Sequence, residues 1–126
     1  KEYRLTIGKE WSRVAQMIRE HTFTRRKGDC WLSENLTDVY AQASSARGMQ
    51  HVGAVQFLSV ELWHKPSGQL VAGEIGYVTG SVYSSCTGFS LKDAFPGCGT
   101  VQLFALGALL KSKRFSLWDL GMEHDY

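Results

Sequence analysis

The sequence has few features of a metal protein, a disulfide-stapled protein or a membrane protein. Three cysteines are an odd number, and neither the cysteines nor the four histidines have the spacing of metal ligands. No apolar run approaches the ~20 residues that a membrane span needs, and the start, Lys1–Arg4, does not resemble a signal peptide. We therefore expect a cytoplasmic protein with free thiols, no cofactor, no metal and no membrane partner.

The charge of the chain is small but unevenly distributed. Residues 1–30 carry eight Lys/Arg and four Asp/Glu, a balance of +4, so the overall +2 leaves −2 for the remainder. The densest basic run is Arg25–Lys27. This run suits a phosphate backbone, and it equally suits a solvated loop.

The 126 residues fit one domain, 1–126, which is possibly a fragment of a longer protein. The first half alternates a strand with two helices. Alternation predicts a strand at Tyr3–Ile7, and apolar residues at helical spacing predict helices around 11–19 and after a Ser33 N-cap. Between the helices, residues 22–29 are polar and predict a loop. Residues 44–53 are small and polar and predict a connector.

The second half predicts an antiparallel meander followed by a helix and a last strand. The expected strands are Ala54–Trp63, Leu70–Val78 and Ser81–Ser85, with a turn at Lys65–Gly68. A glycine-containing loop, Gly88–Gly99, then leads into a helix that is apolar nearly all round, which predicts a buried helix. The final strand, Phe115–Leu120, contains the acid Asp119.

This series of segments resembles the leucyl/phenylalanyl-tRNA–protein transferases, and the resemblance covers nearly the whole chain. The segments that carry it are Tyr3–Thr6, Cys30–Leu32, Phe57–Trp63 (the family's Ser-Ile-Glu-Val-Trp), Leu70–Gly73 (Leu-Val-Gly-Gly), Phe89–Ser90 (the end of Gly-Glu-Ser-Met-Phe-Ser) and Leu117–Asp119 (Leu-Ile-Asp). The resemblance implies an α+β, GNAT-like acyltransferase fold: a central, mostly antiparallel sheet with flanking helices.

The resemblance also implies an activity. Members of this family take Leu or Phe, sometimes Met, from a charged tRNA and attach it to the N-terminal amine of a protein that begins with Arg or Lys, which marks the protein for degradation. The implied partners are therefore an aminoacyl-tRNA and a basic protein N-terminus, and the implied donor is an ester of the terminal adenosine rather than acyl-CoA.

Three positions depart from the family pattern. Cys86 stands where the family has the acid of Gly-Glu-Ser, and Gly121 stands where it has the glutamine of Asp-Cys-Gln. Glu74 replaces an apolar residue of the amino-acid pocket. These changes leave it uncertain whether the chain is an enzyme.

Two carboxylates are candidates for the chemistry. Asp119, at the end of an apolar strand, could accept a proton from the attacking amine, anchor a cationic N-terminus, or merely cap nearby amides. Glu74 lies inside an apolar strand, where a carboxylate is not buried without partners. The pattern favours a solvent-facing Glu74. If Glu74 instead faces the substrate groove, it could bind a basic side chain.

The remaining candidates are aromatic residues and a thiol. Trp31 could form a wall for an adenine or an amino-acid side chain, or belong to the core. Tyr77, Tyr83 and Phe104 could complete an apolar pocket or the core. Cys86 could be a nucleophile, but no histidine is placed by sequence to activate it, so a buried small residue is the simpler interpretation.

Two other functions are compatible with the same sequence. The domain could have lost its chemistry and recognise a protein N-terminus or a tRNA end, as the losses at 86 and 121 suggest. Alternatively, Gly97-Cys98-Gly99 before a helix resembles a CoA-pyrophosphate loop, which would indicate a CoA-dependent N-acetyltransferase.

Overall fold

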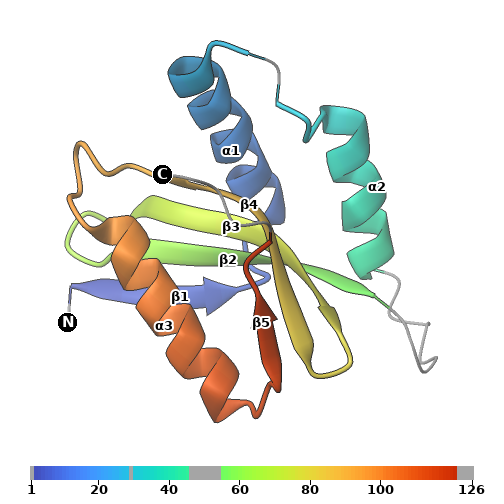
Figure 1. The fold of residues 1–126 in the computed structure, drawn as a ribbon. Coiled ribbons are helices and arrows are strands. Elements are labelled where there is room, and N and C mark those ends of the chain that lie inside the picture. Colours follow the sequence, from blue (N-terminus) through green and yellow to red (C-terminus); the bar gives the residue numbers. More distant parts are fainter. Residues whose placement is uncertain (1, 29, 46–54, 122–126) are drawn as a thin grey trace.

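The computed structural model describes residues 2–28, 30–45 and 55–121, and its centre is a curled five-stranded sheet (Figure 1). The strand order is β1-β2-β3-β4-β5, with antiparallel pairing throughout except for the parallel pair β4–β5. The strands are β1 (Tyr3–Ile7), β2 (Gln56–His64), β3 (Gln69–Thr79), β4 (Val82–Ser90) and β5 (Leu117–Asp119). The predicted mostly antiparallel sheet with flanking helices is confirmed.

Helices cover both faces of the sheet. Figure 1 shows α1 (Trp11–Arg26) and α2 (Glu34–Ser45) on one side and α3 (Cys98–Ser112) on the other. The apolar stripe of α1 packs with Ile75 and Phe89 from the sheet. On the opposite face, Leu106 and Leu110 of α3 pack with Val60 and Tyr83. Helices therefore cover the sheet on both faces.

The two N-terminal helices begin as expected, but α1 is longer. The hydroxyl of Ser33 accepts a hydrogen bond from the Leu36 amide at 3.2 Å, which confirms the predicted N-cap of α2. Residues 22–26, predicted as loop, are helical, and α1 ends at Lys27 in the left-handed conformation with φ 49°. That prediction was wrong because polar, basic residues extend the exposed side of a helix as readily as they form a loop. Most of the predicted 44–53 connector lies outside the described residues.

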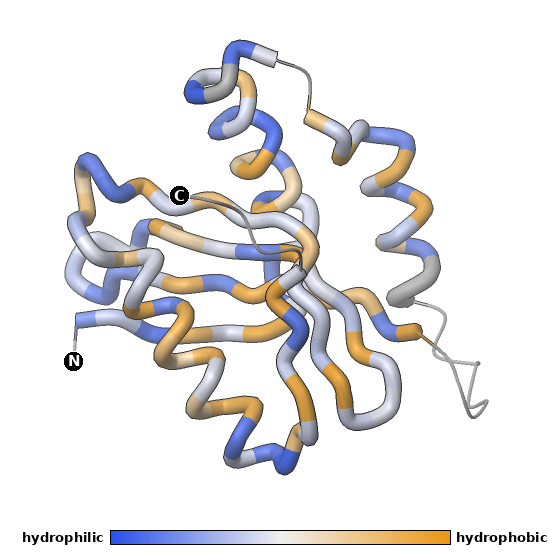
Figure 2. The backbone as a smooth tube through the Cα atoms, in the orientation of Figure 1, coloured by the Kyte–Doolittle hydropathy of each residue, from blue (hydrophilic) through white to orange (hydrophobic). Residues whose placement is uncertain are grey.

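The prediction that α3 is buried all round was also wrong. Only Cys98, Gln102, Leu106 and Leu110 are buried, at a regular spacing of four residues. Figure 2 shows that most of α3 is apolar, yet Leu103 is 48% and Phe104 77% exposed. The helix lies on one face of the sheet, so only one stripe of it is covered.

β4 continues further than predicted, to Ser90, because β3 offers it partners as far as the Gly73–Phe89 and Ala72–Ser90 pairs. A bulge interrupts the pairing. Ile75 pairs with Thr87, whereas Gly76 pairs with Ser85, which leaves Cys86 as the extra residue. Bulges bend and twist a strand, so this one re-aims the side chains on either side of it.

Within the described residues, no helix is long and apolar enough to cross a membrane. In the same part of the chain, no three His, Cys, Asp or Glu side chains gather as metal ligands would.

Glu61 is a fully buried carboxylate that ties three elements together. One oxygen accepts hydrogen bonds from the Ser59 hydroxyl at 2.6 Å and from the amides of Lys9 and Glu10 at 3.0 and 3.1 Å. The other accepts from the Thr6 hydroxyl. The two amides come directly before α1, so a side chain of β2 fixes where that helix starts.

Candidate active site at the β4–β5 fork

The sheet opens where β5 stops pairing with β4. The parallel pairing covers only Val82–Leu117, Tyr83–Trp118 and Ser84–Asp119. Beyond Ser84, no strand in the described part of the chain pairs with the outer edge of β4. The strands therefore form a fork, with Ser84 and Asp119 at its base.

A buried polar cluster, which we call the Glu74 cluster, lies beside this fork. It consists of Glu74, Tyr83, Ser85 and Gln102. The Tyr83 and Ser85 hydroxyls donate to one Glu74 oxygen at 2.7 and 2.8 Å, and the Gln102 amide donates to the other at 2.9 Å. Glu74 is only 6% exposed. The interpretation that it faces solvent was therefore wrong: its side chain points between the sheet and α3, where three donors compensate the burial.

A glycine makes room for the cluster. A Cβ built on Gly76 would lie 2.3 Å from the Tyr83 hydroxyl oxygen and 2.6 Å from the Ser84 carbonyl oxygen, far inside van der Waals contact. Without a side chain at Gly76, the Tyr83 ring lies across β3 and its hydroxyl reaches Glu74. Gly76 thus leaves space for the Tyr83 ring and does not form a turn.

Burial controls the protonation of this cluster. Desolvation raises the pKa of Glu74, and the hydrogen bonds from Tyr83, Ser85 and Gln102 oppose that rise. Burial, followed by the Glu74 charge, raises the pKa of Tyr83, so its hydroxyl remains a donor. The one ion pair within the described residues joins Arg25 and Asp93. Among those residues, Glu74 therefore has neutral partners only.

Trp118 connects β5 to the cluster. Its indole N–H donates to the Ser85 hydroxyl oxygen at 3.0 Å. The ring fits under α3 because Gly107 has no side chain: a Cβ there would lie 3.2 Å from the ring. Ser85 is half-buried and stands at the first position beyond the β4–β5 pairing. It is the member of the cluster closest to the open part of the fork.

Asp119 and Cys86 flank the same place. Asp119 is exposed. It accepts a hydrogen bond from the Gly121 amide at 2.9 Å and a long one from the Ser84 hydroxyl at 3.5 Å. The capping role of this carboxylate is thus present, and its exposure leaves it accessible to a cation. Cys86 is exposed on the bulge, so the interpretation of Cys86 as a buried small residue was wrong. Partial burial of its thiol, followed by the Glu74 and Asp119 charges, raises its pKa.

The raised pKa predicts that Cys86 is a poor nucleophile. Because the thiolate is the reactive form, alkylation by iodoacetamide should be slower at pH 7 than for a free thiol and should accelerate at a higher pH than the alkylation of a free thiol does. Mass spectrometry of the Cys86 peptide against pH, with glutathione as the reference, measures this. Glu74→Gln should speed alkylation, since it removes one of the charges. Rapid alkylation of the wild-type protein at pH 7 would contradict the assignment.

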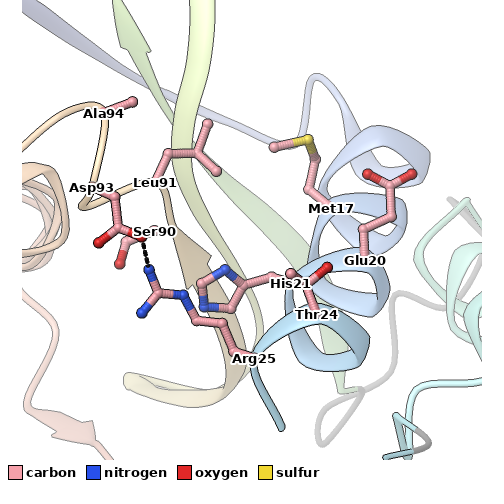
Figure 3. Close-up of a pocket in the computed structure, with 9 residues that line it drawn as sticks. All are labelled: Met17, Glu20, His21, Thr24, Arg25, Ser90, Leu91, Asp93 and Ala94. Carbon is pink, nitrogen blue, oxygen red and sulfur yellow. Dashed lines mark hydrogen bonds and ion pairs between the residues drawn. The ribbon is translucent and has the colours of Figure 1, made fainter. Parts of the chain in front are cut away.

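A second region, on the α1 side of the sheet, contains two cavities that share His21, Arg25 and Ser90. One, of about 340 Å³, lies between the α1 side chains and the loop after β4, where Arg25 bonds Asp93 (Figure 3). The other, of about 410 Å³, adds Trp31 and Lys92 to the lining. We call this region the basic groove. Trp31 is 54% exposed there, so it forms a wall of this groove rather than part of the core.

Two predicted pocket residues lie elsewhere. The Tyr77 ring is tilted against Phe57, which stacks on Tyr40 of α2 at a centroid distance of 4.2 Å. Phe104 is exposed on the outer side of α3 and lines none of the three described cavities. Of the predicted residues, Glu74, Tyr83, Cys86 and Asp119 therefore gather at the fork. Trp31, Tyr77 and Phe104 do not.

Comparison with known proteins agrees with this architecture. A family model described as leucyl/phenylalanyl-tRNA protein transferase matches residues 1–126. The chain belongs to this transferase family. Comparison with curated protein sequences gives no match. Aminoacyl transfer is thus the general chemistry of its family.

A solved structure supports the fold. A protein from Pyrococcus furiosus assigned as an acetyl transferase superposes with a TM-score of 0.62 at 16% sequence identity, over 99% of this chain and 85% of that chain. At this identity the similarity shows the fold alone. The chain therefore has the GNAT-like acyltransferase fold.

Three residues at the site were not indicated by the sequence: Ser85 and Gln102 of the Glu74 cluster, and Trp118, which bonds to Ser85. The alternation of β4 offered one signal, since Tyr83 and Ser85 project from the same face of a strand. Gln102 offered another, as the only polar residue in the apolar run 101–110 apart from glycine. Neither signal identified Glu74 as the shared acceptor, because the strand register, the bulge in β4 and the packing of α3 on the sheet decide which side chains meet.

Proposed function

We propose that this domain transfers Leu, Phe or Met from a charged tRNA to the N-terminal amine of a protein that begins with Arg or Lys, in the cytoplasm, and so marks that protein for degradation. The observation that carries the proposal is the fork at Ser84 and Asp119, lined by a fixed polar cluster, in a chain that matches this transferase family along its whole length.

The basic groove supports a nucleic-acid donor. Arg25, Lys92 and His21 line its larger cavity with basic side chains, and Trp31 offers an exposed ring there, whereas the acids Glu20 and Asp93 line the smaller cavity. Aromatic rings bind unpaired bases by stacking, while Lys and Arg bind phosphates. The terminal adenosine of a tRNA presents both groups. In this arrangement, Trp31 contacts the base and the cations contact the backbone that precedes it.

An apolar cavity supports an apolar amino acid. It encloses about 280 Å³ between α3 and the sheet. Tyr83 links it to the Glu74 cluster: the residue lines this cavity, and its hydroxyl bonds Glu74. Aliphatic and aromatic side chains otherwise line it, with Lys113 as its one charged residue: Ile7, Leu58, Val78, Leu106, Leu109, Leu110 and Phe115. A Leu, Phe or Met side chain would be desolvated there without exposing a polar group.

The reaction itself asks for positioning and proton transfer. The aminoacyl ester is already activated, so bringing the amine to the carbonyl carbon supplies much of the rate. Asp119, exposed at the base of the fork, provides a negative charge for a basic N-terminus. The amine must be neutral when it attacks and must lose a proton afterwards.

A transfer assay tests the proposal. Leucyl-, phenylalanyl- and methionyl-tRNA are mixed with the protein and with peptides that begin with Arg, Lys or Ala, and the extended peptide is measured. We expect extension of the Arg and Lys peptides only. Binding that depends on the first residue without extension would instead indicate a recognition domain. Extension by acetyl-CoA and not by tRNA would indicate an N-acetyltransferase.

Replacing Trp31 with alanine should weaken tRNA binding without unfolding the domain. One lost base stack costs roughly 1–3 kcal/mol, or about five- to 150-fold in affinity. The matched control is Phe23→Ala, since Phe23 is 71% exposed and lines none of the described cavities. Fluorescence anisotropy with a labelled tRNA acceptor stem measures both. Equal affinities for the two variants would remove Trp31 from the donor site.

A further inference from the structure

We propose that Glu74, acting through the Ser85 hydroxyl, accepts the proton of the attacking amine and so replaces the carboxylate that this chain lacks at position 86. The inference rests on the proposed function. The first observation is that a buried carboxylate, Glu74 in β3, bonds to Ser85 beside the bulge of β4, where Cys86 offers only a thiol.

The geometry brings the two positions together. Glu74 is hydrogen-bonded to Ser85, the residue immediately before Cys86, at 2.8 Å. Because Cys86 is the bulged residue, β3 gives it no direct partner. A carboxylate from β3 thus bonds to the residue next to position 86, on the face of the sheet that α3 covers. Three donors and its burial hold the Glu74 group in one orientation.

Ser85 is suited to pass on a proton. A hydroxyl donates one hydrogen bond and accepts two. Ser85 donates to Glu74 and accepts from the Trp118 indole, so it has capacity for one further donor, such as an amine N–H. It is half-buried at the first position beyond the β4–β5 pairs. The proton path therefore runs from the fork through Ser85 Oγ to Glu74 Oε1.

The atoms balance in the following way. The neutral amine nitrogen bonds to the ester carbonyl carbon and gives one proton to Ser85 Oγ, while the Ser85 proton passes to Glu74. The intermediate collapses by breaking the bond to the ribose oxygen. That oxygen then takes a proton back from Glu74 through Ser85. Glu74 ends the cycle as a carboxylate, and an amide and a ribose hydroxyl are formed.

Few titratable groups lie near Glu74 among the described residues. Tyr83 and Cys86 come from β4, and Asp119 comes from β5. The other neighbours do not titrate: Gln102 of α3 bonds to Glu74, and Val60 of β2 pairs with it in the sheet. Burial raises the pKa of Glu74, which brings a carboxylate closer to neutral pH and makes it a better proton acceptor. Activity should therefore rise with pH as Glu74 loses its proton.

The test compares matched variants in the transfer assay. Glu74→Gln and Ser85→Ala should each lower kcat/KM on the order of 100-fold, whereas Ser85→Thr, which keeps the hydroxyl, should stay within a few fold. The limb of the pH profile that belongs to Glu74 should vanish in Glu74→Gln. It should move to higher pH in Tyr83→Phe, because the Tyr83 hydrogen bond lowers the pKa of Glu74.

A rescue experiment separates chemistry from structure. Adding Cys86→Glu to Glu74→Gln returns a carboxylate to position 86 and should recover at least tenfold of the lost rate. Thermal melting checks that every variant folds. If Glu74→Gln fails to fold, Ser85→Ala against Ser85→Thr decides alone. Near-wild-type rates and pH profiles for Glu74→Gln or Ser85→Ala in an active protein would overturn this inference only. An inactive wild-type protein would remove it together with the proposed function.

Discussion

Glu61→Ala should lower the free energy of unfolding by about 3–5 kcal/mol, a large share of the 5–15 kcal/mol that holds a typical domain together. The substitution leaves a hydroxyl on Ser59, another on Thr6, and the amides of Lys9 and Glu10 without their acceptor. A buried donor without a partner costs about 1–3 kcal/mol. Some of the four would find water, which keeps the total below their sum.

Urea denaturation followed by circular dichroism measures the change. The matched control is Glu34→Ala, which removes the same side chain from an exposed position in the first turn of α2 and should change stability by no more than about 0.5–1 kcal/mol. A loss below about 1 kcal/mol for Glu61→Ala would show that the start of α1 and the end of β1 do not depend on this carboxylate.

Glu61 and Glu74 show what the sequence can and cannot predict. Both acids lie inside strands with apolar neighbours, and the rule that a buried carboxylate needs partners applies to both. The structure satisfies the rule in two ways: β1, the segment before α1 and Ser59 provide the donors to Glu61, whereas β4 and α3 provide the donors to Glu74. Whether a strand acid faces inward depends on strand register and on bulges, and neither is determined by the residues around the acid.

The fold itself was predictable because its signals are local. Alternation and turn residues identified the meander, and the Ser33 cap identified the start of α2. The errors fell where tertiary contacts decide. α3 is apolar all round, but the sheet covers only one stripe of it, and Leu103 and Phe104 stay exposed. The same distinction applies to the site. The order of the sequence motifs predicted Asp119 in the last strand, whereas the positions of Ser85 and Trp118 beside Glu74 depend on the folded chain.

The comparison of Asp119→Asn with Cys86→Ala decides which residues carry the reaction. Asp119 lies at the base of the fork and is exposed to it, so we expect its charge to position the basic N-terminus. Removing that charge would misplace the attacking amine and should lower the transfer rate on the order of 100-fold. The fold should survive, because the amide oxygen of Asn can still accept the Gly121 N–H bond.

Cys86→Ala should be much milder. The thiol has its pKa raised by burial and by the charges of Glu74 and Asp119, so at neutral pH it carries no negative charge that could replace a glutamate. Both variants are measured with the same charged tRNA and peptide, over a pH range that includes 7. An inactive Cys86→Ala beside a fully active Asp119→Asn would contradict this assignment. It would mean that the fork operates through thiol chemistry, with Asp119 left as the cap of the Gly121 amide.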